Sequence, residues 1–233
     1  MCFSAGASFG AAAVLSIVGA VAVIKAKTIP QGLFAAIPFI FSIQQVAEGM
    51  LWLSFINDDI PGRSFFTYVF LVFAIMFWPV WIPFTTRLLE KDVTRKKILT
   101  MILIAGIIVS AGFACIILLY PLEAVASQHH IHYKLDLPPA INNFMWLFNI
   151  LYFTTTIIST FISSIKRMKW LGTVFIVGYL FAAYFYNVAV LSVWCYFAAL
   201  LSIVILWIVS EFRIVQDAKQ KLTATIQGSQ IGY

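Results

Sequence analysis

The sequence predicts an all-α protein, a polytopic membrane bundle of seven transmembrane helices with the amino terminus outside and the carboxyl terminus in the cytoplasm. Of its 233 residues, 62% are hydrophobic and 10% are charged, whereas soluble globular domains carry about 25% charged residues. Seven apolar runs are each long enough to cross a bilayer, which takes about 20 residues. Lysine and arginine are concentrated in alternate loops, and this bias predicts the orientation.

The predicted spans account for most of the chain, so we expect one membrane domain at residues 1–210 and a polar cytoplasmic tail at 211–233. The first apolar run lacks a basic start, and we therefore interpret it as a retained helix rather than a cleaved signal. The predicted spans are Ala5–Ile24, Gln31–Phe55, Ser64–Phe84, Ile98–Leu119, Asn142–Ser163, Trp170–Tyr186 and Leu191–Val209.

The distribution of basic residues sets the orientation. With seven spans, thirteen of the 15 Lys and Arg residues fall on one side, and Arg63 and Lys134 fall on the other. Because Lys and Arg accumulate in cytoplasmic loops, the amino terminus is predicted to lie outside. Because the basic residues lie in short loops between spans, membrane orientation and anionic lipid explain the net charge of +6. We therefore do not expect a nucleic-acid partner. The last two runs are separated by Asn187–Val190, so six spans are an alternative, but the charge pattern favours seven.

One carboxylate, Glu48, stands inside the second span. A charge at membrane depth costs at least about 2.5 to 3.5 kcal/mol on insertion scales, so such residues usually face the bundle interior and mark functional sites. Helical spacing places Gln44, Gln45 and Trp52 on nearly the same stripe as Glu48. We therefore take Glu48 as the candidate catalytic residue, with a purely structural role as the alternative.

The predicted orientation brings thiols and imidazoles to the depth of Glu48. These groups, together with carboxylates, form the zinc, copper and iron sites of proteins. A solvated histidine loop and a Cys115–Cys195 disulfide are the alternatives to a metal centre. The sequence thus predicts a metal site near the outer face, with Trp194 beside it and with ligands drawn from Cys2, Glu48, His129, His130, His132 and Cys195.

Three functional classes fit this pattern. In a membrane metalloenzyme, Glu48 would act as general base toward a metal-bound water, and hydrolytic or redox chemistry would both fit. In a transporter or small-molecule receptor, Glu48 would bind a cation or a proton, and in the third class the chain is a structural subunit of a membrane complex. The seventh span contains no lysine, which excludes a retinal Schiff base there.

Two prolines, Pro79 and Pro83, interrupt the third span and predict a bend. Trp78 and Trp81 beside them fit an interfacial aromatic belt better than a cofactor-stacking role.

Several motifs also carry a family resemblance: the opening MCFSAGASF, QQVAEGMLWL, PVWIP, HHIHY and SVWCYFAALLS. Together they resemble a family of small multi-pass bacterial membrane proteins of unknown function. The resemblance covers nearly the whole chain and implies the bacterial inner membrane, but it implies no activity. The family positions matched here are Cys2, Ser4, Glu48, Trp52, His129, His130, Trp194 and Cys195.

Overall fold

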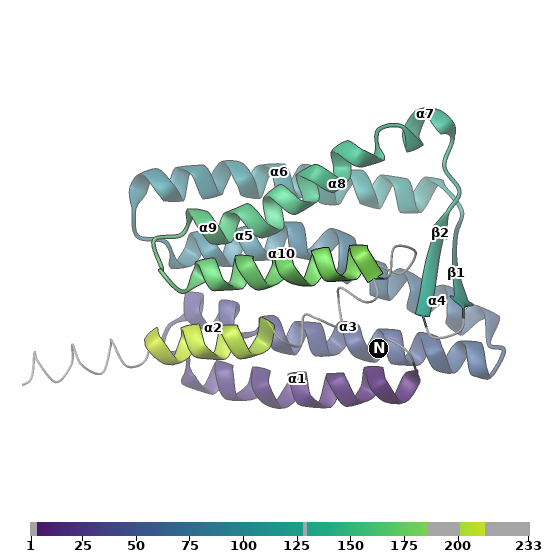
Figure 1. The fold of residues 1–233 in the computed structure, drawn as a ribbon, viewed down its shortest axis with the longest axis horizontal. Coiled ribbons are helices and arrows are strands. Elements are labelled where there is room, and N and C mark those ends of the chain that lie inside the picture. Colours follow the sequence, from purple (N-terminus) through teal and green to yellow (C-terminus); the bar gives the residue numbers. More distant parts are fainter. Residues whose placement is uncertain (1–3, 128–129, 186–200, 213–233) are drawn as a thin grey trace, which may run out of the picture.

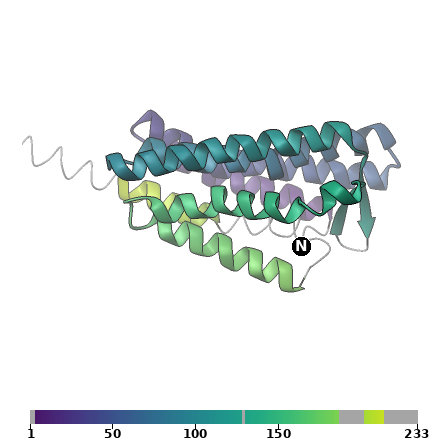
Figure 2. The same cartoon turned by 90° about the horizontal axis from the view of Figure 1, so that it is seen from above.

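The computed structural model describes residues 4–127, 130–185 and 201–212, and most of these are helical. The helices run along one long axis, and a two-stranded hairpin lies at one end of the bundle (Figures 1 and 2). Within the described residues, six helical stretches are long and apolar enough to cross a membrane. The prediction of a multi-pass membrane protein is therefore supported, while the start of the predicted seventh span lies outside the described residues.

The first two spans form an antiparallel pair. Helix α1 (Ala5–Lys25) starts at Ser4, whose hydroxyl accepts a hydrogen bond from the main-chain N–H of Ala7 at 3.2 Å. The second span consists of α2 (Ile29–Ala35) and α3 (Ile37–Ile56). A Cβ atom at Gly19 of α1 would overlap the main chain of Phe39, so the absence of a side chain allows the two helices to pack closely.

The third span is irregular where the sequence predicts a bend. It consists of α4 (Ile60–Leu71), the π-helical segment η1 (Val72–Phe77) and α5 (Trp78–Leu89). We call η1 the wide turn. It lies just before Pro79, because proline has no N–H to donate and its ring clashes with the carbonyl one turn earlier.

Neighbouring helices bind two carbonyl groups of this wide turn. Tyr152 donates its hydroxyl to the carbonyl oxygen of Ala74 at 2.7 Å, and Ser110 donates to that of Met76 at 2.6 Å. Backbone polar groups at membrane depth need such partners. The irregular segment is therefore held in place by the fourth and fifth spans.

The remaining spans complete the bundle. Tyr152 belongs to the fifth span, which contains a second π-helical segment directly after it, and a short helix at residues 201–212 covers the described part of the predicted seventh span. The elements are α6 (Val93–Leu119), α7 (Pro139–Asn142), α8 (Met145–Phe153), η2 (Thr154–Ile158), α9 (Ser159–Ile162), α10 (Met168–Phe185) and helix Leu201–Phe212.

The antiparallel hairpin of β1 (Leu122–Ser127) and β2 (His130–Leu135) is absent from the predicted all-α fold. It packs onto the ends of α3 and α4, which we call the hairpin end of the bundle. Ile131 is fully buried against Leu51 and Trp52, and Tyr133 stacks on Phe70 with ring centroids 5.1 Å apart.

The opposite end, here called the basic end, joins loops that are far apart in sequence. Lys25 donates to the hydroxyl of Ser210 at 3.2 Å, and Arg167 pairs with Glu211 at 2.9 Å. Glu211 lies in helix Leu201–Phe212, and the predicted tail from residue 213 onward lies outside the described residues. The orientation of the two ends across a membrane stays a prediction.

Candidate functional site: a buried polar cluster on α3

Polar side chains line the inner face of α3 in the half of the span nearer the hairpin. Gln44, Gln45 and Glu48 are each 0% exposed, and Trp52 is 7% exposed. Glu48 lies eight residues before the end of α3, a rise of about 12 Å. The stripe predicted from helical spacing is therefore buried inside the bundle, where unpaired polar groups are costly.

Gln44 links α3 to the third span. The indole N–H of Trp78 donates to Gln44 Oε1 at 2.9 Å, and the Trp78 ring stacks on Phe41 with centroids 3.9 Å apart. Trp78 is 4% exposed. The interpretation of Trp78 as part of an interfacial belt was therefore wrong, because this residue joins two helices in the core.

Two polar atoms of residues next to Glu48 on α3 retain hydrogen-bonding capacity. Gln45 Nε2 donates to Glu48 Oε2 at 3.3 Å. Within the described chain, Gln45 Oε1 and Trp52 Nε1 are buried and have no hydrogen-bonding partner. One unused acceptor and one unused donor thus lie within one turn of Glu48, on either side of it.

Helix α1 adds a third unused group. Ser8 is 0% exposed, and its hydroxyl also has no partner among the described residues. The next residue, Phe9, lies against Gly49, where an added Cβ would meet its ring. Ser8 is therefore at the level of Glu48 on the adjacent helix, and Ser8, Gln44, Gln45, Glu48 and Trp52 together form what we call the polar cluster.

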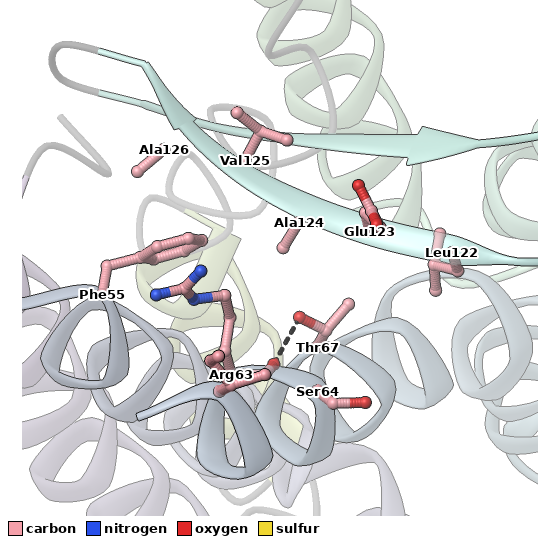
Figure 3. A pocket seen from close by; sticks show the side chains of 10 residues that line it. Phe55, Arg63, Ser64, Thr67, Leu122, Glu123, Ala124, Val125 and Ala126 are labelled. Atoms are coloured by element: carbon pink, nitrogen blue, oxygen red, sulfur yellow. Dashed lines mark hydrogen bonds between the residues drawn. The ribbon is translucent and has the colours of Figure 1, made fainter. Parts of the chain in front are cut away.

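A cavity of about 510 Å³ lies beyond this cluster at the hairpin end. Figure 3 shows strand β1 passing above the first turns of α4, with Arg63 rising between them toward Phe55. The Phe55 ring packs edge-on against Trp52, with centroids 6.4 Å apart. The two aromatic rings therefore stand between this cavity and the neighbourhood of Glu48.

Arg63 is held at the cavity wall by three contacts. Its guanidinium carbon lies 4.5 Å from the centre of the Phe55 ring, and its Nη2 donates to Asp58 Oδ1 at 3.1 Å. Thr67 donates its hydroxyl to the Arg63 carbonyl at 2.7 Å (Figure 3). Asp58 has a positive φ of 52°, a left-handed conformation that Asp tolerates better than most residues. The Arg63–Asp58 ion pair is partly exposed. The Nε of Arg63 has no hydrogen-bonding partner among the described residues.

The described histidines do not face the polar cluster. His130 and His132 alternate with Ile131 along β2, so they lie on the strand face opposite to the one that packs on α3. In the part of the chain that the structure describes, no group of three or more His, Cys, Asp or Glu side chains could hold a metal ion. The predicted ligands Cys2, His129 and Cys195, together with Trp194, lie outside the described residues.

Cys115 of α6 is an exposed free thiol. Cys195, with which the sequence allows a disulfide, is not among the described residues, so that bridge stays an untested alternative.

A second buried carboxylate, Glu90, was not singled out from the sequence. It lies between α5 and α6 at the basic end and is 2% exposed. Its carboxylate accepts four hydrogen bonds, from the main-chain N–H groups of Lys91 and Asp92 at 2.8 and 2.9 Å and from the N–H and hydroxyl of Ser164 at 2.6 and 2.7 Å. We call this arrangement the Glu90 clamp.

The clamp also sets the charge state of Glu90. Burial raises the pKa of this carboxyl, but the hydrogen bonds from Ser164, Asp92 and Lys91 outweigh burial and hold the pKa below its ordinary value. The group is therefore a carboxylate at neutral pH. No sequence motif predicts the burial of Glu90, because its main partner, Ser164, is 74 residues away in the chain.

Comparison with known proteins gives a family but no activity. The model of a family of unknown function, DUF6629, matches residues 1–221. No curated protein and no solved structure matches the chain.

Proposed function

The chain belongs to the family of unknown function DUF6629, and we propose that it is an integral membrane protein that binds a proton or a small cation at Glu48. The observation that carries this proposal is the polar cluster, in which a fully buried carboxylate adjoins polar atoms with unused hydrogen-bonding capacity. A packed core leaves few buried polar atoms without a partner, as Ser8 Oγ, Gln45 Oε1 and Trp52 Nε1 are here among the described residues.

The atoms of the cluster favour a hard, positively charged ligand. Glu48, Gln45 Oε1 and Ser8 Oγ all present oxygen, the element that hard metal cations prefer as ligand, and a carboxylate can also bind a proton or an ammonium group. A carboxylate in a low-dielectric interior also requires a proton or a positive group nearby. The cluster therefore suits reversible occupation by such a ligand.

The cavity beside Arg63 provides an approach to the cluster. Phe55 lines this cavity and packs on Trp52, which lies one helical turn from Glu48. We infer that displacement of these two rings admits the ligand from the hairpin end. Since thirteen of 15 basic residues belong to the other side of the predicted topology, the hairpin end is proposed to face outward from a bacterial inner membrane.

The irregular third span favours a transporter over a fixed receptor. Membrane transporters commonly place their sites beside interrupted helices, and Gln44 of the cluster is bonded to Trp78 directly after η1. A ligand at Glu48 would thus act on the third span through the hydrogen bond between Gln44 and Trp78.

Proton uptake tests the proposal. The full chain is reconstituted into liposomes containing a pH-sensitive dye, and the outside is acidified; infrared difference spectra of the same samples report protonation of carboxyl groups. We expect acidification inside the vesicles and a carboxyl band that are both lost in Glu48→Gln. Asp136→Asn, which alters an exposed carboxylate after β2 that does not line the cavity beside Arg63, should behave like the wild type.

The outcomes are distinct. A folded Glu48→Gln variant with the wild-type band and wild-type flux would contradict the proposal, whereas loss of the band without any flux in the wild type would favour a receptor. The same assay with sodium, potassium and ammonium gradients identifies a cation other than the proton.

A transition-metal centre is the competing proposal for this site. It requires thiolate or imidazole ligands from Cys2, His129 or Cys195 in addition to Glu48, since His130 and His132 lie on the other face of β2. Elemental analysis of purified protein separates the two: stoichiometric zinc, copper or iron that is lost in Cys195→Ser would replace the proton or cation site by a metal site, with hydrolytic or redox chemistry to follow.

A further inference from the structure

A second cavity, of about 350 Å³, lies between the hairpin and four of the spans. Its wall includes Ile75 of η1, Phe113 of α6, Tyr133 of β2, Tyr152 of α8 and Tyr179 of α10. Its volume falls within the range of about 300 to 1,000 Å³ that is typical of small-molecule sites. It is separate from the cavity beside Arg63, although Leu122 of β1 lines both.

The chemistry of its wall selects against charge. None of its lining residues is Asp, Glu, Lys, Arg or His, and most are aliphatic or aromatic. A charged ligand would lose its hydration here without gaining an ionic partner. The cavity therefore suits a molecule that is neutral and largely apolar.

Asn149 supplies the main polar feature. It lies ten residues into the 24-residue span Pro139–Ile162 and is exposed rather than packed. Its carboxamide makes no hydrogen bond to any residue that the structure describes, and it lines the cavity. A carboxamide at membrane depth without a partner is unfavourable unless it faces a ligand or water. Asn149 can both donate to and accept from a ligand.

Aromatic rings line the same cavity as this carboxamide. Phe153 packs against Tyr179 with ring centroids 4.2 Å apart, and both line the cavity with Tyr152. Tyr152 also donates to Ala74 in η1, so its ring is fixed in direction. Such walls favour a flat ring, which can pack face-on or edge-on against them.

We propose that this cavity binds the ring of a neutral lipid that carries hydrogen-bonding carbonyl or hydroxyl groups, the chemistry of an isoprenoid quinone. Asn149 donates to a ring carbonyl, the aromatic side chains enclose the ring, and the apolar tail extends into the bilayer. Binding alone is proposed, and it is independent of the proton or cation site at Glu48.

The short-tailed quinone decylubiquinone is a suitable probe. The full chain is placed in phosphatidylcholine nanodiscs, and its thermal midpoint and intrinsic fluorescence are followed as the probe is added, because a ligand that binds the native state raises the midpoint. We expect saturable quenching and a rise in the midpoint. Asn149→Leu should weaken binding by about tenfold, the value of one hydrogen bond of about 1 to 1.5 kcal/mol, whereas Asn143→Leu, the same change outside the cavity, should not.

Three results would overturn the proposal. The first is quenching that rises without saturation in every variant, which indicates partition into the lipid. The second is equal affinity in Asn149→Leu, Asn143→Leu and the wild type. The third is displacement of the probe by oleate at equal concentration, which would assign the cavity to an anionic lipid. If Asn149→Leu fails to fold, Asn149→Asp provides the same test, because a carboxylate in this uncharged cavity should weaken binding at least as much.

Discussion

Two buried carboxylates of this chain have opposite surroundings. Glu90 at the basic end accepts four hydrogen bonds and joins the α5–α6 loop to the segment after α9. Glu48 at the hairpin end receives a bond from Gln45 of its own helix, and beside it lie polar atoms of Ser8, Gln45 and Trp52 with no partner among the described residues. Both carboxylates are buried, but Glu90 is held by fixed donors of two loops, whereas Glu48 adjoins buried polar atoms of other residues that have no partner within the described chain.

This difference separates a structural role from a binding role. In the Glu90 clamp, hydrogen bonds from fixed donors offset the desolvation of the carboxylate. These bonds hold the α5–α6 loop against the segment after α9. In the polar cluster, buried donors and acceptors of Ser8, Gln45 and Trp52 have no partner among the described residues. Their burial costs free energy, and a bound ligand that makes hydrogen bonds to them would offset that cost. Variants that act on one region and spare the other can test this distinction.

The largest effect is expected for Glu90→Ala. The substitution removes the acceptor of four part-buried hydrogen bonds, and we expect the free energy of unfolding to fall by about 3 kcal/mol. For a chain of this size the thermal midpoint would fall by roughly 6 to 12 °C, measured by scanning fluorimetry in detergent. Glu211→Ala, which removes a partly exposed ion pair, is the control and should lower stability by less than about 1 kcal/mol. Equal effects of the two variants would show that the clamp is not structural.

Acid should remove the contribution of Glu90. Its pKa is lowered in the folded state, so its stabilising effect is present above the ordinary carboxyl pKa and is lost as the pH falls through the lowered folded value. Thermal midpoints of the wild type and Glu90→Gln should therefore differ at neutral pH and converge at a pH below about 4. A constant difference between them down to the acid limit of the measurement would argue against the clamp.

The smallest effect, and the most direct comparison, comes from two Ser→Ala substitutions. Ser164→Ala removes a hydroxyl that donates to Glu90 and should lower the free energy of unfolding by about 1.5 kcal/mol. Ser8→Ala removes a buried hydroxyl without a partner and should leave stability unchanged or raise it by up to about 1 kcal/mol. Thermal or denaturant unfolding of both variants gives the answer. A loss of stability in Ser8→Ala equal to that in Ser164→Ala would mean that the polar cluster is already satisfied.

The membrane spans were predictable because hydropathy depends on short stretches of sequence. Observed bounds such as Ala5–Lys25 and Val93–Leu119 differ from the predicted ones by a few residues. The hairpin was missed although His130–Leu135 alternates apolar and polar residues, since its histidines were interpreted as metal ligands. The wide turn before Pro79 follows from the proline, but its exact register depends on contacts with Ser110 and Tyr152.

The candidate site was predictable only in part. Helical spacing correctly placed Gln44, Gln45, Glu48 and Trp52 on a buried face. The roles of Ser8, Trp78 and Asn149 depend on which helices are neighbours, and the burial of Glu90 depends on a loop 74 residues away. Such long-range contacts leave no local signature in composition or periodicity.

The wide turn η1 also divides the third span into two parts. A π-helical turn contains about one residue more than an α-helical turn, and one residue corresponds to a rotation of about 100° around the helix axis. Phe70, before the turn, is aligned with Tyr133 of the hairpin, and Trp78, after it, is aligned with Gln44 of α3. Deletion of one residue between them would leave only one of these alignments intact, so the angular register of this span is set separately at its two ends.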